Sequence, residues 1–237
     1  MLKLDGITIQ FGGLTALKDV SFSMGTDQVV GLVGPNGAGK TTLFNAISGL
    51  VRPTHGSVSF NGTELGKKPL YTRARVGIGR TFQIPQPMHE LTVRENLVVA
   101  QRFGNGRVDH ARIDEILKFM DLYEQAGRDA ATGLALQELK RLEVAKALAT
   151  EPKLLLLDEV LAGLEVNGKR YFTAKLKELH EQFKLGILII EHDIETVSTL
   201  CHRVVVLNFG KVIADGAPDT VFRDPEVIKS YTGAGHA

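Results

Sequence analysis

The sequence predicts an α/β fold that combines a mostly parallel sheet with an antiparallel β region and an inserted helical region. An apolar strand at residues 29–33 leads through a glycine-rich turn into a helix with apolar residues at helical spacing. Two fully apolar runs, 154–157 and 186–190, are typical of parallel strands buried on both faces. Apolar residues also recur at helical spacing through residues 87–150.

The N-terminal part has the alternating pattern of strands. Apolar and polar residues alternate over 2–10 and 16–23, which predicts two antiparallel strands ahead of the strand at 29–33. Residues 56–60 and the turn Asn61-Gly62 predict a further hairpin. A short strand is expected at 76–81.

The helical region is bounded by a proline-containing loop and by the return to the sheet. Its break at Gly104-Asn105-Gly106 separates the first predicted helix from the second. The predicted helical stretches are 91–97, 113–120 and 139–148. We expect one domain over 1–237, in which 1–86 and 151–237 form the core with its antiparallel β subdomain and 87–150 a helical subdomain.

Composition excludes several classes of protein. The 237 residues carry 28 Lys and Arg against 27 Asp and Glu, so no global charge favours nucleic acid or an anionic membrane. A single cysteine, Cys201, excludes an internal disulfide framework, and we expect it to be buried in a reducing cytosol. No apolar run approaches the ~20 residues that span a bilayer, and the N-terminus lacks the pattern of a signal peptide. We expect a cytoplasmic chain.

The glycine-rich turn is a P-loop, because the pattern GxxxxGK[ST] lies between a strand and a helix. Its glycines let backbone N–H groups and the positive end of the helix face a polyphosphate. We expect Lys40 to reach the β- and γ-phosphates, Thr41 to ligate Mg²⁺ and Thr42 to face the α-phosphate. The nucleotide-binding residues predicted here are Gly34, Pro35, Asn36, Gly37, Ala38, Gly39, Lys40, Thr41 and Thr42.

Polar residues at strand ends complete the candidate chemistry. Asp158 follows a buried strand and can hold Mg²⁺, and Glu159 is placed to polarise an attacking water. His192 follows the strand 186–190, where it would point toward the γ-phosphate, although a histidine there is more often structural. Gln83 stands in a loop after the strand 76–81, a place where an isolated glutamine is usually only solvated.

Phe11 precedes the flexible pair Gly12-Gly13. Its ring can stack on a purine, and an exposed phenylalanine on a hairpin is equally common.

Taken in order, these motifs resemble the nucleotide-binding subunits of ATP-binding-cassette (ABC) transporters along the whole chain. Phe11, residues 34–42, Gln83, the pair Asp158-Glu159 and His192 match that family's A-loop, Walker A, Q-loop, Walker B with catalytic glutamate, and H-loop. The resemblance implies a P-loop NTPase (RecA-like) core with an N-terminal antiparallel β subdomain and an inserted α-helical subdomain.

Three further stretches narrow the resemblance to the ATPase subunits of branched-chain amino-acid importers and their relatives for urea and short-chain amides. They are Phe11-Gly12-Gly13-Leu14, Gly79-Arg80-Thr81-Phe82-Gln83 and Asp224-Pro225-Glu226-Val227-Ile228. Such a subunit would hydrolyse ATP to drive an importer.

The resemblance also assigns roles and partners. Phe11 would stack on adenine, and the metal would be held by Thr41, Gln83 and Asp158, with Gln83 sensing Mg²⁺ and the attacking water. Expected partners are polytopic permease subunits at the inner face of the membrane, a second ATPase subunit and, indirectly, a solute-binding protein, with no nucleic acid. The segment after Gln83 would dock the permease, where Ile84, Pro87, Met88 and Leu91 form either a docking edge or internal packing.

Three departures from the family pattern stand out. The signature Leu-Ser-Gly-Gly-Gln is replaced by Leu134, Ala135, Leu136, Gln137 and Glu138, which removes the serine hydroxyl and both glycines. Val160 replaces a proline, and the D-loop reads Ala162-Gly163-Leu164-Glu165. Because the residues 34–42 are intact and the signature is not, the sequence favours a heterodimer with a partner that has a complete signature. A homodimer that uses Gln137 as a substitute donor stays open.

Two other functions compete with that of a transport ATPase. One is a soluble ABC ATPase for repair, ribosomes or iron–sulfur assembly, which the absence of a long coiled-coil insertion and of a second P-loop disfavours. The other is a catalytically weak regulatory module, which the altered signature favours. The transported solute cannot be read from this chain, because other subunits select it.

Overall fold

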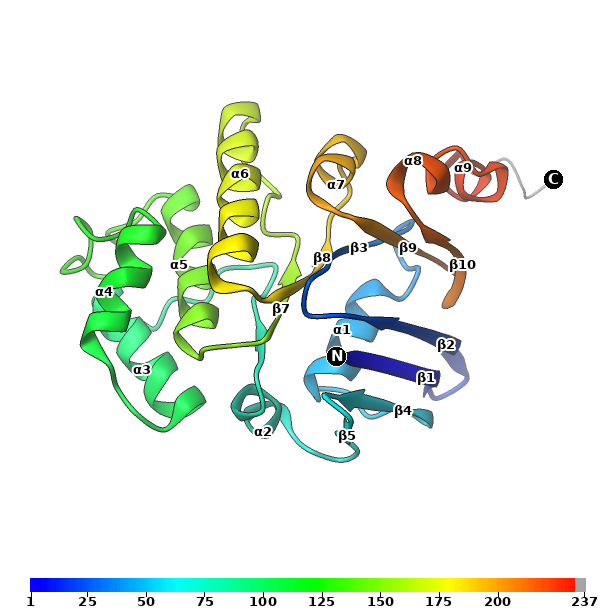
Figure 1. Cartoon of the computed structure of the whole chain (residues 1–237), viewed down its shortest axis with the longest axis horizontal. Helices are drawn as coiled ribbons and strands as arrows, with labels where there is room; N and C mark the ends of the chain where they lie inside the picture. Colours follow the sequence, from blue (N-terminus) through cyan, green and yellow to red (C-terminus); the bar gives the residue numbers. More distant parts are fainter. Residues whose placement is uncertain (233–237) are drawn as a thin grey trace. The chain divides into compact units, whose positions relative to one another are not determined.

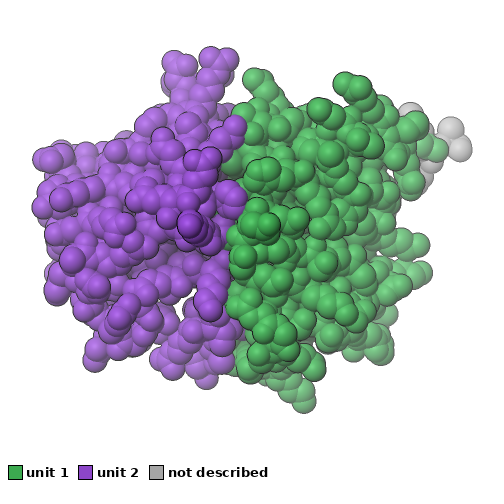
Figure 2. All heavy atoms as spheres, viewed as in Figure 1, with its two compact units in different colours: residues 1–70, 186–237 green, residues 71–185 purple. Residues whose placement is uncertain are grey.

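The computed structural model describes residues 1–232, which form two compact units. Unit 1 combines residues 1–70 with the C-terminal part from Gly186 onward, and unit 2 spans residues 71–185. Figure 2 colours unit 1 green and unit 2 purple. The predicted helical subdomain 87–150 lies inside unit 2, and its bounds stay a prediction.

Unit 1 contains an antiparallel sheet built from the N-terminal strands (Figure 1). Its order is β2-β1-β4-β5, with β1 (Leu2–Phe11) between β2 (Leu14–Met24) and β4 (His55–Phe60), and β5 (Thr63–Glu64) at the edge. The alternation seen in the sequence places Leu2, Leu4, Ile7 and Ile9 in the core. The predicted strands and hairpin are confirmed.

Unit 1 also contains parallel strands that carry the glycine-rich turn. Strand β3 (Val29–Val33) pairs in parallel with β8 (Gly186–Ile190) and with β9 (Arg203–Asn208). Strand β10 (Lys211–Gly216) is antiparallel to β9. Every residue of β3 and β8 is buried, as expected for strands covered on both faces.

Among the described residues of unit 1 there are four helices: α1 (Lys40–Ser48), α7 (Ile194–Leu200), α8 (Pro218–Val221) and α9 (Pro225–Thr232). Helix α1 ends at Gly49, whose φ of 85° is the left-handed conformation that closes a helix. Cys201 follows α7 and is buried as expected, and this burial raises the pKa of its thiol to about 12.

Unit 2 pairs two parallel strands and carries the predicted helices. Strand β6 (Ile78–Arg80) lies beside β7 (Leu154–Asp158). The helices are α2 (Leu70–Arg75), α3 (Val93–Asn105), α4 (His110–Phe119), α5 (Leu136–Ala149) and α6 (Val166–Phe183). The helical reading of 91–97, 113–120 and 139–148 is confirmed by α3, α4 and α5, whereas α2 and α6 were not expected from the sequence.

Local signals explain where α3 and α4 begin and end. The Thr92 hydroxyl accepts a hydrogen bond from the Glu95 N–H at 3.2 Å, and the Glu95 carboxylate accepts from the Thr92 N–H at 2.8 Å. Gly106 closes α3 at a φ of 81°, and the Asp109 carboxylate then caps α4. The predicted break at Gly104-Asn105-Gly106 is therefore confirmed only at its last residue, because Gly104 and Asn105 still belong to α3.

Candidate functional site

The predicted site residues fall into two sets. Unit 1 contains Phe11, residues 34–42 and His192, and unit 2 contains Gln83 and the pair Asp158-Glu159. Each set is built by its own unit.

The glycine-rich turn of unit 1 has a backbone that only glycine can adopt at two points. A Cβ on Gly34, where φ is 144°, would lie 2.0 Å from the carbonyl oxygen of Leu207 in β9. A Cβ on Gly39, where φ is 104°, would lie 2.8 Å from the carbonyl oxygen of Ala16 in β2. The turn thus packs closely against strands β9 and β2, one from each sheet, which limits the backbone conformations open to it.

Lys40 is folded back beneath this turn. Its Nζ donates to the carbonyl oxygens of Gly34 at 2.7 Å and Pro35 at 2.9 Å, and only 6% of the residue is exposed. The carbonyl oxygens of the loop therefore compensate the buried ammonium. The backbone N–H groups of the same loop are the ones expected to face a phosphate. Thr41, next in the chain, is exposed.

Helix α1 starts at Lys40 with an uncapped N-terminus. Its N-cap residue is Gly39, which has no side chain to bond the first N–H groups, and no acidic residue occupies the first turn. The positive end of the helix dipole is thus unopposed by a carboxylate of its own helix, the arrangement that attracts an anion.

His192 lies at the same sheet edge as the turn. In the parallel pair β3 and β8, Leu32 is opposite Ile190, so His192 and Gly34 each follow two residues beyond that level. Asp193 fixes the backbone after His192, because its carboxylate accepts from the N–H groups of Glu195 at 3.0 Å and Thr196 at 3.3 Å. His192 is exposed at this edge.

Phe11 stands at the end of β1, opposite Leu14 in β2. The residue is 51% exposed, so a flat ligand can reach its side chain. Its role as an adenine platform stays a prediction.

Sequence reasoning missed a contact between the C-terminal helix and the glycine-rich turn. Tyr231 in α9 lies near the backbone of Gly34. Burial raises the pKa of the Tyr231 hydroxyl, and the nearby Gly34 backbone opposes that shift. The sequence analysis singled out the nearby stretch Asp224-Pro225-Glu226-Val227-Ile228 but not Tyr231.

Unit 2 holds Asp158 through the pairing of β6 and β7. The register Arg80 opposite Leu156 continues into Thr81, whose N–H donates to the Leu156 carbonyl at 2.9 Å. The Thr81 hydroxyl accepts from the Asp158 N–H at 3.1 Å. The backbone at the end of β7 is thereby fixed.

Arg80 pairs with the Asp158 carboxylate at 3.3 Å, and both side chains are only 4% exposed. Burial lowers the pKa of the Arg80 guanidinium, and the neighbouring Asp158 carboxylate opposes this shift. The guanidinium lies 5.0 Å from the ring centroid of Phe82, which adds a cation–π contact. Arg80 was noted in the sequence only as part of a family stretch.

Gln83 and Glu159, predicted separately, are brought together. The Gln83 Nε2 donates to the Glu159 Oε2 at 2.6 Å. Lys140, from α5, joins both residues, because its Nζ donates to the carbonyl oxygens of Gln83 at 3.0 Å and Glu159 at 3.2 Å. Lys140 is buried and was not singled out from the sequence. One helix thus ties the loop after β6 to the turn after β7.

The start of α5 lacks the donors that a complete signature would offer. Ala135 is its N-cap and makes no side-chain cap, and the Ala135 N–H donates instead to the Glu138 carboxylate at 2.8 Å. Leu136 is 46% exposed. This helix end therefore presents an apolar side chain and a carboxylate.

The other two departures from the family pattern, at Val160 and in the D-loop, disturb none of the contacts described above. Val160 is buried, which suits an apolar replacement for proline. Glu165 is the N-cap of α6 and makes no side-chain cap there. Glu159 itself adopts a φ of 49°, a left-handed conformation that sets the direction of its side chain.

The available ligand atoms fit a hard divalent cation. Within residues 1–232 no group of three His, Cys, Asp or Glu residues could hold a metal alone. Mg²⁺ needs only one or two carboxylates when substrate phosphates complete its shell. The Gln83 amide nitrogen donates to Glu159, so the oxygen of that amide and the carboxylate of Asp158 are the ligand types in unit 2 that suit Mg²⁺.

No helix in the described part of the chain combines the length and the apolar character needed to cross a membrane.

Comparison with known families gives two matches. The family described as ABC transporter matches residues 17–162. The family described as branched-chain amino acid ATP-binding cassette transporter matches residues 211–237. The first match covers the glycine-rich turn, Gln83 and the pair Asp158-Glu159, and the second includes Tyr231.

Comparison with individual proteins gives similarity along nearly the whole chain. The chain is 37% identical to the high-affinity branched-chain amino acid transport ATP-binding protein BraF of Pseudomonas aeruginosa, covering 98% of each. It is 35% identical to the corresponding protein LivG of Salmonella typhimurium, again over 98% of each. A solved structure of the ADP conformation of an ATP-binding cassette of an ABC transporter is 31% identical, with a TM-score of 0.89 over 98% of each chain.

Proposed function

This chain belongs to the ABC transporter family, as an ATP-binding subunit that hydrolyses ATP, and on that premise we propose that it energises the import of branched-chain amino acids. The observation that carries the proposal is the near-complete coverage by relatives named for that transport. Urea and short-chain amides are the related solutes against which this choice is tested.

The proposed roles in ATP hydrolysis follow from the negative charge of the phosphoryl group that is transferred to water. Lys40 and the N–H groups of residues 34–42 would hold the β- and γ-phosphates, and Glu159 would take a proton from the attacking water. Gln83 would orient that water through the Gln83–Glu159 hydrogen bond of 2.6 Å. His192 would face the γ-phosphate from the end of β8.

Thr41, Gln83 and Asp158 would hold Mg²⁺, which when bound neutralises charge on the β- and γ-phosphate oxygens. Arg80 keeps the Asp158 carboxylate in place through the buried pair at 3.3 Å. Lys140 keeps Gln83 and Glu159 at a fixed separation through its bonds to their carbonyl oxygens. These two cations therefore position the groups that act on the phosphate.

Uptake into proteoliposomes tests the proposed solute. The chain is co-expressed with its candidate permease and second ATPase subunits, purified as one assembly and reconstituted with solute-binding protein outside and ATP inside. We expect ATP-dependent uptake of radiolabelled L-leucine that exceeds uptake of urea and acetamide. Faster uptake of urea or acetamide would replace the solute. Failure of any polytopic membrane protein to co-purify would favour a soluble ABC ATPase instead.

We propose that the loop after β6 docks the permease at the cytoplasmic side of the membrane. Ile84 is 70% exposed, whereas Pro87, Met88 and Leu91 are half-buried. The Met88 N–H also donates to Asn96 at 2.8 Å, which ties it to α3. Ile84 is thus the residue of this edge best placed for a partner, and the other three belong in part to internal packing.

Replacing Ile84 by Asp tests this docking edge. We expect at least a tenfold loss of ATP-driven uptake, because a carboxylate at an apolar contact leaves an unpaired charge at the interface. The ATPase rate of the purified chain without membrane subunits should be unchanged, and so should the urea concentration at the midpoint of its unfolding. Ile228→Asp, on an exposed part of α9, is the matched control. Normal uptake by the Ile84 variant would contradict docking here.

We propose that the catalytic partner is a different ATPase subunit. In the family, the signature of one subunit grips the γ-phosphate held by the other. Here Ala135 has no hydroxyl, and the Glu138 carboxylate that accepts from the Ala135 N–H would repel that phosphate. The phosphate-holding face of this chain is intact, so it needs a partner with a complete signature.

Restoring the signature tests the heterodimer. In the triple variant Ala135→Ser, Leu136→Gly, Gln137→Gly, we expect the purified chain alone to hydrolyse ATP about 10- to 100-fold faster, since a hydrogen bond to a charged oxygen contributes about 1.5–3 kcal/mol. Glu138→Gln alone isolates the effect of the carboxylate. The rates are measured across protein concentrations. A fast, concentration-dependent rate from the original chain, unchanged by the triple variant, would support a homodimer.

A further inference from the structure

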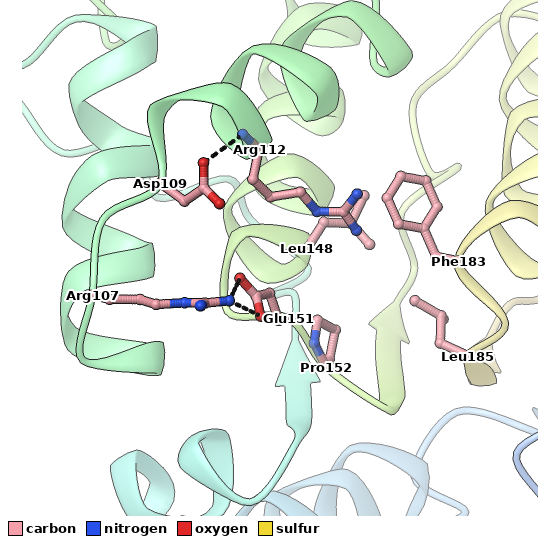
Figure 3. A pocket seen from close by; sticks show the side chains of 8 residues that line it. All are labelled: Arg107, Asp109, Arg112, Leu148, Glu151, Pro152, Phe183 and Leu185. Carbon is pink, nitrogen blue, oxygen red and sulfur yellow. Dashed lines mark hydrogen bonds and ion pairs between the residues drawn. The ribbon is translucent and has the colours of Figure 1, made fainter.

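Unit 2 contains a pocket of about 340 Å³ that no step of ATP hydrolysis uses (Figure 3). This volume lies at the lower end of the range of about 300–1,000 Å³ found for ligand pockets. A small metabolite suits it better than a nucleotide or a peptide.

The polar part of the pocket has charges of both signs. Its lining includes the guanidiniums of Arg107 and Arg112 and the carboxylates of Asp109 and Glu151. Two positive and two negative groups disfavour a phosphate or another multiply charged anion, because the two carboxylates would repel it. A ligand with one positive and one negative group matches this lining.

The charged side chains of the pocket still have hydrogen-bond donors and acceptors available for such a ligand. Arg107 uses a single nitrogen, Nη2, which donates to both oxygens of Glu151 at 3.1 Å. Its other N–H groups and the remaining lone pairs of Glu151 can bind a carboxylate and an ammonium side by side. Asp109 accepts from the Arg112 N–H through Oδ1 at 3.1 Å, and its Oδ2 accepts no hydrogen bond from residues 1–232.

The guanidinium of Arg112 is held in place from two sides. Its Nη1 pairs with Glu115, and its Cζ lies 4.6 Å from the ring centroid of Phe183. Figure 3 shows the Arg112 side chain reaching across the pocket toward Phe183. Its remaining donors are thus pre-oriented for a carboxylate, which lowers the entropy lost on binding.

The rest of the lining is apolar. Leu148 and Leu185 are each 2% exposed, and Pro152 and Phe183 complete this surface. The apolar surface still open to a ligand therefore comes from Pro152 and Phe183, which are half-buried. An aliphatic side chain that covers these two residues would be stabilised by roughly 25 cal/mol for each Å² of apolar surface buried.

We propose that this pocket binds a free α-amino acid with a branched aliphatic side chain. The ammonium lies against Asp109 and Glu151, the carboxylate against Arg107 and Arg112, and the side chain against the apolar lining. The choice of a branched aliphatic side chain among apolar ones rests on the proposed function. The zwitterion itself rests on the lining alone.

The position of the pocket gives such binding a consequence. Leu148 lies in α5, whose first turn carries the altered signature, and Pro152 leads into β7, which ends at Asp158. Helix α5 also holds Gln83 and Glu159 through Lys140. A bound amino acid thus contacts the far ends of the two elements that carry the catalytic groups, where imported solute could feed back on ATP hydrolysis.

Calorimetric titration of the purified chain with L-leucine tests the site directly. We expect one-site binding that is at least tenfold weaker with L-leucinamide, which lacks the carboxylate, and with 4-methylpentanoate, which lacks the ammonium. No heat of binding with L-leucine would overturn the proposal. Equal binding of 4-methylpentanoate would also overturn it, since the site would then be a simple anion site.

Two variants locate the binding. Arg112→Gln and Arg107→Gln should each weaken L-leucine binding at least tenfold, and the largely exposed Arg107 can be changed without disturbing the core. Arg223→Gln, an exposed arginine of unit 1 outside the pocket, is the matched control and should bind as the original chain does. Binding that survives both pocket variants would overturn the assignment. These titrations measure binding to the purified chain and not transport. A negative result would therefore contradict only this pocket, and leucine uptake by the assembly would still test the proposed function.

Discussion

Glu159→Gln should stop ATP turnover while leaving ATP binding intact. The amide oxygen of a glutamine can still accept from the Gln83 Nε2, which now lies 2.6 Å from Glu159 Oε2, so the local geometry is kept. The amide cannot take a proton from water, and the loss of a general base typically costs ~10²–10⁴-fold in rate. The measurement is steady-state ATPase of the purified assembly, together with the affinity for a fluorescent ATP analogue.

Glu124→Gln is the matched control for this change. Glu124 is an exposed glutamate of unit 2 that is outside the candidate site, so its variant should hydrolyse ATP at the original rate. A Glu159 variant that turned over within twofold of the original chain would show that another group acts as the base. Loss of analogue binding together with turnover would instead indicate a structural role for Glu159.

Arg80→Met should destabilise the chain by about 3–5 kcal/mol, because it removes an ion-pair partner of a buried carboxylate. Asp158 and Arg80 are each 4% exposed, so little water can compensate for the lost pair. Methionine keeps much of the volume of the arginine stem, which limits the contribution from a cavity. The measurement is urea unfolding, with the slope of the transition compared between variants.

A double variant separates the loss of the ion pair from other effects. Adding Asp158→Asn to Arg80→Met removes the buried carboxylate charge that Arg80 no longer compensates, so part of the stability should return. Lys3→Met is the control for an exposed pair, since Lys3 and Asp5 are 65% and 64% exposed and such pairs contribute only about 0–1 kcal/mol. A loss below about 1 kcal/mol for Arg80→Met would contradict the role assigned to Arg80.

Local patterns predicted the elements because their causes are local. The strand 29–33, the glycines with positive φ and the start of α1 follow one another within twenty residues, so steric rules and hydrophobic spacing suffice to identify them. The same holds for α3, where Thr92 and Glu95 form the capping box. Other elements were not predicted, namely α2, α6, α7, α8, α9, β9 and β10. Helix α6 was missed although it is 18 residues long with a buried face of Phe172, Leu176 and Leu179.

The sequence by itself determined which residues are predicted to hold phosphate and which residues follow the buried strands, since each is defined by its neighbours in the chain. Only the tertiary structure decided which of them are joined and by what. Gln83 meets Glu159 across 76 positions, and Arg80 meets Asp158 across 78, because β6 and β7 pair in one particular register. Lys140 binds both loops because α5 packs beside that pair. Contacts of this kind depend on strand register and helix packing, which cooperative burial of the core sets and no local pattern records.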